Sequence, residues 1–440
     1  MPTGIYYFPE GFLWGTATAA HQVEGRNQNN TWSDWEQEEG RIDAGHTSRL
    51  ACDWWGGRWR EDFDRAQAGG QNAHRMSIAW SRIQPAPDRW DENALDRYRE
   101  MLIGLQERKM TPMVTLHHFS EPLWVAEMGG WENEAVIELF ASFVHKSVEA
   151  LKPYCRLWVT INEPNVFVFS AYLDGVFPPG KQDFRAAYRV LRNMVRAHAR
   201  AYAVIHEVQP ESRVGIAIQY RGFEPATWLP TDRWAAKIYR HLFNDLFPHT
   251  LKEGIFNAIL KKEPIPEAVG TQDFLGINYY TTETLRFDPF APGSFFTKRT
   301  FSEDAVVSES GFMANLPQGM IKAVLWGEKF GVPIIITENG VDDSMDELRP
   351  RYTLEHLYAL WQVMNGKAVV EGYFHWSLVD NFEWERGWTQ HFGLWGLNRE
   401  TQARIHRPSV DMYAEICRLN GISTETVKKY APESLSTLFP

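Results

Sequence analysis

Short apolar runs rich in β-branched residues alternate with amphipathic stretches along the whole chain. The apolar runs have the length of buried strands. We expect eight strands, at residues 13–17, 73–78, 113–117, 157–161, 214–218, 274–277, 334–337 and 372–376. The amphipathic stretches predict helices at residues 91–107, 134–151, 184–208, 317–330, 353–364 and 409–419. Strands that alternate with helices in this way indicate parallel βαβ units.

The number of these units predicts the architecture. Eight strands fit one closed (β/α)8 barrel, an α/β fold of the TIM-barrel type with long βα loops, and we expect residues 1–440 to form this single domain. The alternative is an open, doubly wound sheet. That sheet favours a glycine-rich phosphate turn after an early strand, and neither G-x-G-x-x-G nor G-x-x-x-x-G-K occurs in the sequence. The closed barrel is therefore the preferred prediction.

Polar residues gather where the predicted strands end. They are Arg75, His117, His118, Asn162, Glu163, Gln219, Asn278, Tyr280, Glu338 and the region of Trp376. In a (β/α)8 barrel these ends converge on one mouth, where active sites lie. Strand ends are often polar simply because loops begin there. That reading explains the polarity, but it explains less well why two glutamates, two amides, an arginine, histidine and tyrosine occur together.

Two of these residues are suited to acid–base chemistry at a sugar. Glu163 ends the fourth predicted strand in TINEPN, and Glu338 ends the seventh in IITENG. Retaining glycosidases use two carboxyl groups roughly 5–5.5 Å apart, one as acid/base and one as nucleophile. Each segment could equally be a plain turn that closes a strand, and the chain has 56 acidic residues from which to choose. Pro164 predicts an extended backbone at Glu163 under either reading.

Two other residues at the strand ends could affect the ionisation of Glu338. Arg75 could hold this carboxyl ionised, because an adjacent cation lowers the pKa of a carboxyl group. Tyr280 could donate a hydrogen bond to it. A surface arginine and a buried tyrosine bonded to the backbone are the alternatives, and the strand context of residues 73–78 weakens the first of them.

Seven segments, taken in order, resemble a known family. They are FPEGFLWGTATAAHQVEG at 8–25, HRMSIAWSRIQP at 74–85, TLHHF at 115–119, TINEPN at 160–165, GINYY at 276–280, IITENG at 335–340 and SLVDNFEWERGW at 377–388. Over nearly its whole length the chain resembles family 1 glycoside hydrolases, the β-glucosidase and β-galactosidase family. The resemblance implies a (β/α)8 barrel and retaining hydrolysis of β-glycosides without a metal or organic cofactor.

The resemblance also implies roles for individual residues. Glu163 matches the acid/base and Glu338 the nucleophile, with Arg75, Tyr280 and Asn278 beside the nucleophile. Residues that match contacts to sugar hydroxyls are Gln22, His117, Asn162, Glu383 and Trp384, and Trp376 matches the platform beneath the sugar. On the leaving-group (aglycone) side we expect Phe312 and Asn165. Phe312 stands where many members carry a tryptophan, and His391 also departs from the family pattern, so the preferred leaving group stays open.

These residues favour a particular substrate. We expect a β-linked di- or oligosaccharide, or an aryl or alkyl β-glycoside, cleaved from its non-reducing end. β-Glucosidase activity with β-galactosidase and β-fucosidase cross-activity is expected. A carboxylate at Glu383 would repel a 6-phosphate, which favours an unphosphorylated sugar. A transglycosylating member of the same family and a catalytically silent sugar-binding protein are the alternatives.

Composition excludes other classes of function. The net charge of −11 is diffuse, which argues against nucleic acid and anionic membranes as partners. Three cysteines without CxxC spacing, and an N-terminus without a signal-peptide pattern, predict a cytoplasmic protein without a disulfide framework. No apolar run approaches the ~20 residues that span a bilayer. His117 and His118 are adjacent on a strand and point to opposite faces, so no metal site is expected.

Overall fold

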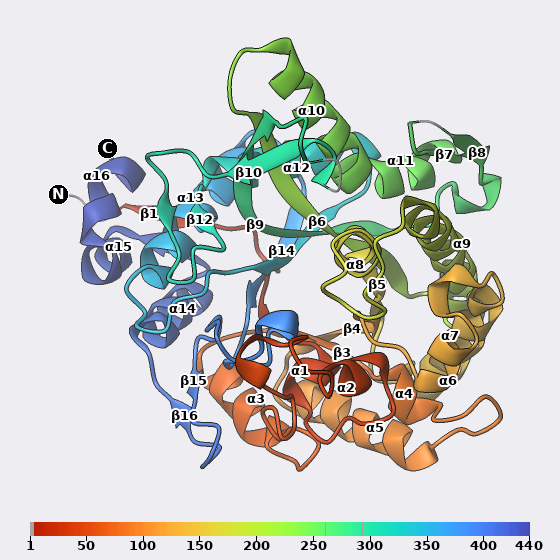
Figure 1. Ribbon diagram of the computed structural model, residues 1–440. Helices are drawn as coiled ribbons and strands as arrows, with labels where there is room; N and C mark the ends of the chain where they lie inside the picture. Colours follow the sequence, from red (N-terminus) through yellow and green to blue (C-terminus); the bar gives the residue numbers. More distant parts are fainter. Residues whose placement is uncertain (1–3, 260, 292–293) are drawn as a thin grey trace.

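A computed structural model describes residues 4–259, 261–291 and 294–440, and at its centre lies a closed barrel of eight parallel strands (Figure 1). The barrel strands are β2 (Leu13–Ala17), β3 (Ala73–Ser77), β4 (Thr111–His117), β5 (Leu157–Asn162), β6 (Arg213–Pro225), β9 (Phe274–Phe287), β13 (Ile334–Asn339) and β14 (Val370–Trp376). The ring closes because β14 pairs with β2 and β6 pairs with β9, all in parallel. Each strand overlaps one of the eight predicted strands, so the predicted (β/α)8 fold is confirmed.

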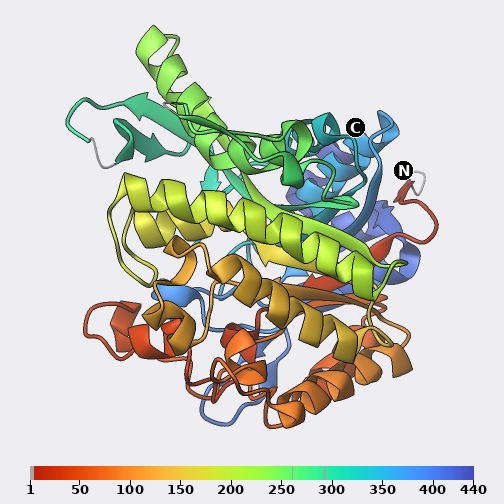
Figure 2. The ribbon, with the colours of Figure 1, turned by 90° about the vertical axis from the view of Figure 1, so that its right-hand side faces the viewer.

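Helices cover the outside of the barrel. The larger ones are α3 (Trp59–Ala68), α5 (Glu92–Glu107), α7 (Val136–Leu151), α8 (Pro164–Tyr172), α9 (Phe184–Val208), α10 (Pro230–Arg240), α11 (Leu246–Glu253), α12 (Gln318–Gly327), α13 (Arg349–Asn365) and α14 (Pro408–Leu419). Figure 2 shows α7 and α9 running side by side along the barrel. With helices outside and packed side chains inside, strands such as β5 and β13 are buried along their whole length.

Smaller elements complete the fold. The short helices are α1 (Ala20–Val23), α2 (Thr31–Trp35), α4 (Trp80–Ile83), α6 (Leu123–Glu127), α15 (Thr424–Tyr430) and α16 (Leu435–Leu438). The short strands are β1 (Ile5–Tyr7), β7 (Ile255–Asn257), β8 (Lys262–Pro264), β10 (Thr297–Thr300), β11 (Val306–Val307), β12 (Ala314–Asn315), β15 (Gly396–Leu397), β16 (Arg404–Ile405) and β17 (Gly421–Ser423). Antiparallel pairing of β1 with β17 brings the two ends of the chain together (Figure 1).

Local sequence explains where the helices begin. Asp91 caps α5, because its carboxylate accepts hydrogen bonds from the backbone N–H groups of Asn93 and Ala94. Asp183 caps α9 in the same way. The predicted helix at 353–364 lies within the longer α13, and α3 and α8 were not predicted. Most residues of α8 are buried, so this helix has no polar stripe that would reveal a helical period.

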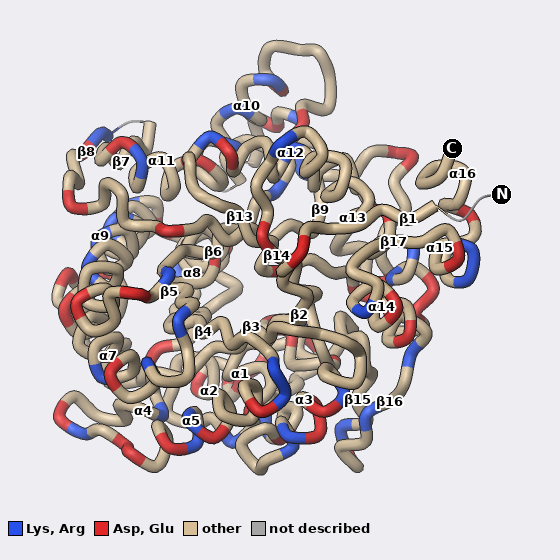
Figure 3. Tube along the Cα trace, turned by 180° about the vertical axis from the view of Figure 1, so that it is seen from behind, with Lys and Arg blue, Asp and Glu red and all other residues tan. Residues whose placement is uncertain are grey.

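Charged residues of both signs are spread over the outside of the barrel (Figure 3), and the three cysteines are buried. Figure 3 shows Lys and Arg interspersed with Asp and Glu over the outer helices. Cys52, Cys155 and Cys417 are buried free thiols. Over the described part of the chain, every helix is too short or too polar to cross a bilayer.

Two adjacent residues of α5 allow a matched test of the packing. Leu102 is fully buried against the barrel, whereas Ile103 is 36% exposed. We expect Leu102→Ala to lower the free energy of unfolding by about 2–5 kcal/mol. Ile103→Ala should lower it by less than half as much, because fewer contacts are lost. Urea unfolding followed by tryptophan fluorescence measures both, and equal losses would contradict this placement of the helix.

Candidate active site

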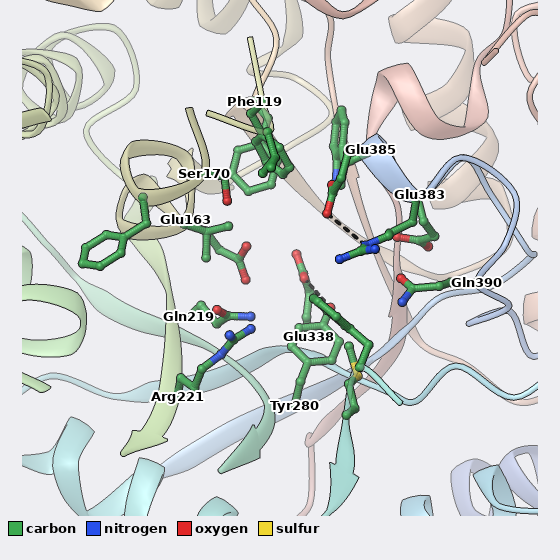
Figure 4. Close-up of a pocket in the computed structure, with 18 of the residues that line it drawn as sticks. Phe119, Glu163, Ser170, Gln219, Arg221, Tyr280, Glu338, Glu383, Glu385 and Gln390 are labelled. Carbon is green, nitrogen blue, oxygen red and sulfur yellow. Dashed lines mark hydrogen bonds and ion pairs between the residues drawn. The ribbon is translucent and has the colours of Figure 1, made fainter. Parts of the chain in front are cut away.

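A cavity opens at the carboxyl ends of the barrel strands, and both glutamates line it (Figure 4). Glu163 follows β5 and Glu338 lies in β13. Of the other residues predicted for the site, Tyr280, Trp376, Glu383, Trp384 and Phe312 also line this cavity. Arg75, Asn162, Asn278 and Gln22 are buried around it and bond to the side chains that line it. The barrel therefore assembles side chains from distant parts of the sequence at one mouth.

Glu163 has an unusual backbone conformation. Its φ of 43° and ψ of 59° are left-handed, and Pro164 begins α8 directly after it. The prediction of an extended backbone here was wrong. Proline disfavours the right-handed helical region for the preceding residue, and the chain satisfies this restriction in the left-handed region instead. Left-handed conformations of residues other than glycine cost energy and gather at functional sites. The turn from strand to helix points the Glu163 side chain into the cavity.

Glu338 receives two short hydrogen bonds from charged and polar donors. Arg75 Nη1 donates to Glu338 Oε1 at 2.6 Å, and the Tyr280 hydroxyl donates to Oε2 at 2.6 Å. Arg75 is itself 1% exposed, and its Nη2 donates to Asn162 Oδ1 at 2.6 Å. Charge-assisted bonds of this length stabilise the ionised carboxylate. Both of its oxygens are therefore held in a fixed position as an anion.

Glu163 has a weaker donor. Asn278 Nδ2 donates to Glu163 Oε1 at 2.8 Å, while Asn278 Oδ1 accepts from the Thr337 hydroxyl at 2.6 Å. Asn278 Nδ2 also donates to Asn162 Oδ1 at 3.2 Å, and that oxygen accepts from Arg75. The nitrogen end of the Asn278 amide therefore faces Glu163. An amide donor carries no charge, so it stabilises a carboxylate less than the guanidinium beside Glu338 does.

The two carboxyls consequently differ in their affinity for a proton. Burial, and then the charge of Glu338, raise the pKa of Glu163 above its ordinary value. Burial also raises the pKa of Glu338, but Arg75 and Tyr280 oppose this shift. Since two neighbouring buried carboxyls do not both ionise easily, these environments favour the proton on Glu163 and the charge on Glu338. This division is the one required of an acid and a nucleophile.

A second group of polar residues surrounds Glu383. Gln22 Nε2 donates to Glu383 Oε2 and Trp376 Nε1 donates to Oε1, each at 3.2 Å. Burial raises the pKa of Glu383 well above its ordinary value. Gln22 Oε1 is buried and accepts no hydrogen bond from the described residues. Gln22, Trp376 and Glu383 form a polar wall of the cavity. This wall presents several acceptors, to which a ligand rich in hydroxyl groups would donate.

The two adjacent histidines lie on opposite sides of the strand end, and His118 rather than His117 lines the cavity. His118 Nε2 is 3.0 Å from Asn162 Nδ2, and its ring stacks against Trp376 and Trp384. His117 instead packs its ring against Trp131 and accepts the indole hydrogen bond at 3.3 Å. The prediction that His117 contacts a ligand is therefore wrong, and His118 takes that place.

The reason lies in the phase of the strand. Thr115 already points inward, since its hydroxyl accepts a hydrogen bond from Arg75 Nε at 3.1 Å. Strict alternation from Thr115 would point His117 inward as well. The alternation breaks at the end of β4, and the left-handed Phe119 follows with a φ of 65°. Sequence alternation cannot locate such a break.

The two residues predicted on the leaving-group side have different positions. Phe312 lines the cavity, and the guanidinium of Arg386 lies 5.3 Å from the centre of its ring. Asn165 is not among the lining residues. Its Nδ2 donates to the backbone carbonyls of Gln219 and Phe243, so it braces the neighbouring chain, and the prediction of a leaving-group contact is wrong.

Several residues that line the cavity were not predicted as site residues. They are Asp174, Gln219, Arg221, Arg299, Glu385, Arg386 and Gln390. Gln219 lies at a predicted strand end, and Glu385 and Arg386 belong to the segment SLVDNFEWERGW at 377–388. The other four lie in loops, in β10 or beyond the barrel portion of β6, and their types and spacing form no recognisable motif. Across the described residues, no group of three His, Cys, Asp or Glu side chains has the arrangement of a metal site.

Comparison with known proteins agrees with this geometry. The model for "Glycosyl hydrolase family 1" matches residues 5–422. The chain is 33% identical to β-glucosidase A of Thermotoga maritima, over 94% of this chain and 98% of that protein. It superimposes on a β-glycosidase from Pyrococcus horikoshii with a TM-score of 0.91 and 34% identity, covering 97% and 98% of the two chains. A T. maritima β-glucosidase in complex with glucoimidazole gives a TM-score of 0.89 at 31% identity, covering 95% and 100%.

The unequal protonation of the two glutamates can be measured directly. We expect carbon-13 NMR of side-chain-labelled glutamate to show, besides the high-titrating carboxyl of Glu383, a further carboxyl that titrates well above the ordinary range and disappears in Glu163→Gln. Glu338→Gln should lower the pKa of that same carboxyl, because the neighbouring negative charge is gone. A high-pKa resonance that survives in Glu163→Gln and vanishes in Glu338→Gln would reverse the assignment.

Proposed function

Because the chain belongs to glycosyl hydrolase family 1, we propose that it is a retaining, exo-acting β-glycosidase in which Glu338 is the nucleophile and Glu163 the acid/base. The observation that carries this proposal is the unequal environment of two glutamates in one cavity. Glu338 is held by a guanidinium and a phenol, whereas Glu163 is buried beside a neutral amide. One carboxylate ready to attack and one carboxylic acid ready to donate are the two groups that a double displacement requires.

In the first step the carboxylate of Glu338 attacks the anomeric carbon. The bond from that carbon to the glycosidic oxygen breaks, and the electron pair stays on the oxygen. Glu163 transfers its proton to the same oxygen, so the leaving group departs as a neutral alcohol. A glycosyl ester on Glu338 remains, and Glu163 is now a carboxylate.

In the second step a water molecule takes the place of the leaving group. Glu163 accepts a proton from the water as its oxygen bonds to the anomeric carbon. The ester bond breaks, Glu338 regains its negative charge, and Glu163 is again protonated. Two inversions at one carbon give net retention of the β configuration.

The polar wall around Glu383 supports a sugar as the ligand. Glu383 and Gln22 offer acceptors for hydroxyl groups, and Trp376 offers a flat apolar face. These side chains are at most 7% exposed, so they close one end of the cavity and favour a terminal sugar over an internal one. We expect β-glucosides to be cleaved, with β-galactosides and β-fucosides as further substrates. Adding a 6-phosphate would place a negative group beside Glu383, in a site where burial already disfavours negative charge.

The compartment also belongs to this proposal. Three buried free thiols suit a reducing environment, and we propose that the enzyme is cytoplasmic. The substrate that we propose is a β-linked di- or oligosaccharide, or an aryl or alkyl β-glycoside.

Azide distinguishes the roles of the two glutamates. We expect Glu338→Gly to lose activity by several orders of magnitude, and azide with 2,4-dinitrophenyl β-glucoside should restore turnover to an α-glucosyl azide, because azide can then attack from the face that Glu338 vacates. Glu163→Gly on the same glucoside should instead give the β-azide, through a glycosyl ester on Glu338. Azide products with the α configuration from Glu163→Gly would contradict the assignment of the acid/base.

The pH profile tests the same assignment without a rescue reagent. Glu338 must be ionised and Glu163 protonated, so kcat/KM should be bell-shaped. Because burial and the Glu338 charge raise the pKa of Glu163, activity should persist above the ordinary glutamate range and fall as pH rises through that raised value. In Glu163→Gln the alkaline limb should vanish. An unchanged alkaline limb would show that another group supplies the proton.

A further inference from the structure

Arg221 lines the cavity on the side of Glu163, although no motif singled it out. Figure 4 shows its guanidinium beside Gln219, on the Glu163 side of the cavity. Its side chain is 15% exposed. Arg75, the other cation near the two carboxyls, is already bonded to Glu338 and Asn162. Arg221 is therefore the cation placed to act on Glu163.

The pairing of β6 with β9 explains how Arg221 reaches this position. Gln219 lies opposite Asn278 and Tyr220 opposite Tyr279, but the next pair is Gly222 with Thr282. Tyr280 and Thr281 of β9 thus face Arg221 alone, which is a β-bulge. Bulges next to active sites re-aim side chains. Here the bulge places Tyr280, which donates to Glu338, opposite Arg221.

Arg221 is also braced at three points. Its backbone N–H donates to Asn244 Oδ1 at 3.2 Å, and its carbonyl accepts from Asn244 Nδ2 at 2.8 Å. Its Nη1 donates to Glu283 Oε1 at 3.0 Å. That is the one side-chain hydrogen bond that Arg221 makes among the described residues, so other N–H groups of the guanidinium remain to face the cavity. The arginine is held in place without being fully neutralised.

We propose that Arg221 is a positioning residue that stabilises the carboxylate of Glu163 after its proton has passed to the leaving group. This inference rests on the proposed acid/base role of Glu163. During the first step a negative charge appears on Glu163 in a buried site, while Glu338 becomes a neutral ester. A fixed cation at that place lowers the cost of the developing charge without having to rearrange.

The charged and titratable groups around this pair come from several elements. Those facing Glu163 are Glu338 of β13, Arg75 of β3, Tyr280 of β9 and Arg221 of β6. Those facing Arg221 are Glu283 of β9, Arg299 of β10 and Asp174 after α8. Attraction to Arg221 and Arg75 opposes the rise in the pKa of Glu163 that burial and Glu338 cause. Removing Arg221 should therefore raise that pKa further, whereas removing the charge of Glu283 should lower it.

Four variants test the role by the sign and size of the shift in the pKa of Glu163. In Arg221→Met the alkaline limb of kcat/KM should move to higher pH, because Glu163 becomes a weaker acid. Arg221→Lys should move it less. In Glu283→Gln, which leaves the arginine in place, the limb should move to lower pH. The double variant Arg221→Met/Glu283→Gln removes both members of the Arg221–Glu283 ion pair, and it should keep a smaller upward shift.

A series of β-glucosides with different leaving groups gives the second measurement. A weaker acid matters most where the leaving oxygen needs its proton. Arg221→Met should therefore lose about tenfold more kcat/KM on an alkyl glucoside than on the 2,4-dinitrophenyl glucoside, a part of the 10²–10⁴-fold that general acid catalysis supplies. Arg221→Met could instead keep the wild-type dependence on the leaving group and the wild-type alkaline limb of kcat/KM, and show only a lower melting temperature. That result would make Arg221 a structural brace and overturn the inference.

The same series separates this inference from the proposed function. Glu163→Gln should show the steepest dependence on the leaving group. If Glu163→Gln has the wild-type dependence, the acid/base assignment fails and the role of Arg221 fails with it. If Glu163→Gln behaves as expected and Arg221→Met matches wild type, the inference about Arg221 alone is wrong.

Discussion

The bond between Arg75 and Glu338 decides how the two buried carboxyls share one proton. Both lie in a site that penalises charge, and both pKa values are raised by burial. Arg75, together with the Tyr280 hydroxyl, favours Glu338 as the ionised group. Arg75 is 1% exposed and bonds both Glu338 and Asn162, so its position is fixed on two sides. The asymmetry that follows supports the proposed roles of Glu338 as the nucleophile and Glu163 as the acid.

The closed barrel is what makes this asymmetry possible. Arg75, Glu163, Tyr280 and Glu338 lie on or directly after four different strands, and each reaches the mouth because parallel strands end on the same side. Departures from regular pairing gather at these ends, between Val159 and Asn162, between Ile336 and Glu338, and opposite Arg221. Regular strands supply the rigid frame, and the irregular ends aim the side chains.

Sequence patterns predicted the frame well and its irregular ends poorly. All eight strands are visible as apolar runs, because burial on both faces leaves a continuous signal. Glu163 was expected to be extended, yet it is left-handed, since the rule for the residue before proline excludes one region without selecting among the others. The resemblance was matched to His117, whereas His118 lines the cavity, because the sequence of two adjacent histidines does not show which of them faces inward. Arg221 gave no signal, because its place depends on a bulge in the partner strand.

The most direct test of the central claim is to trap the glycosyl ester. A 2-deoxy-2-fluoro-β-glucoside with a 2,4-dinitrophenyl leaving group should inactivate the enzyme with one equivalent of dinitrophenol released, since the fluorine slows both steps while the activated leaving group keeps the first one fast. Mass spectrometry of the digested protein should then find the fluorosugar on the peptide that contains Glu338. A sugar attached to Glu163, or inactivation with no covalent sugar, would contradict the account.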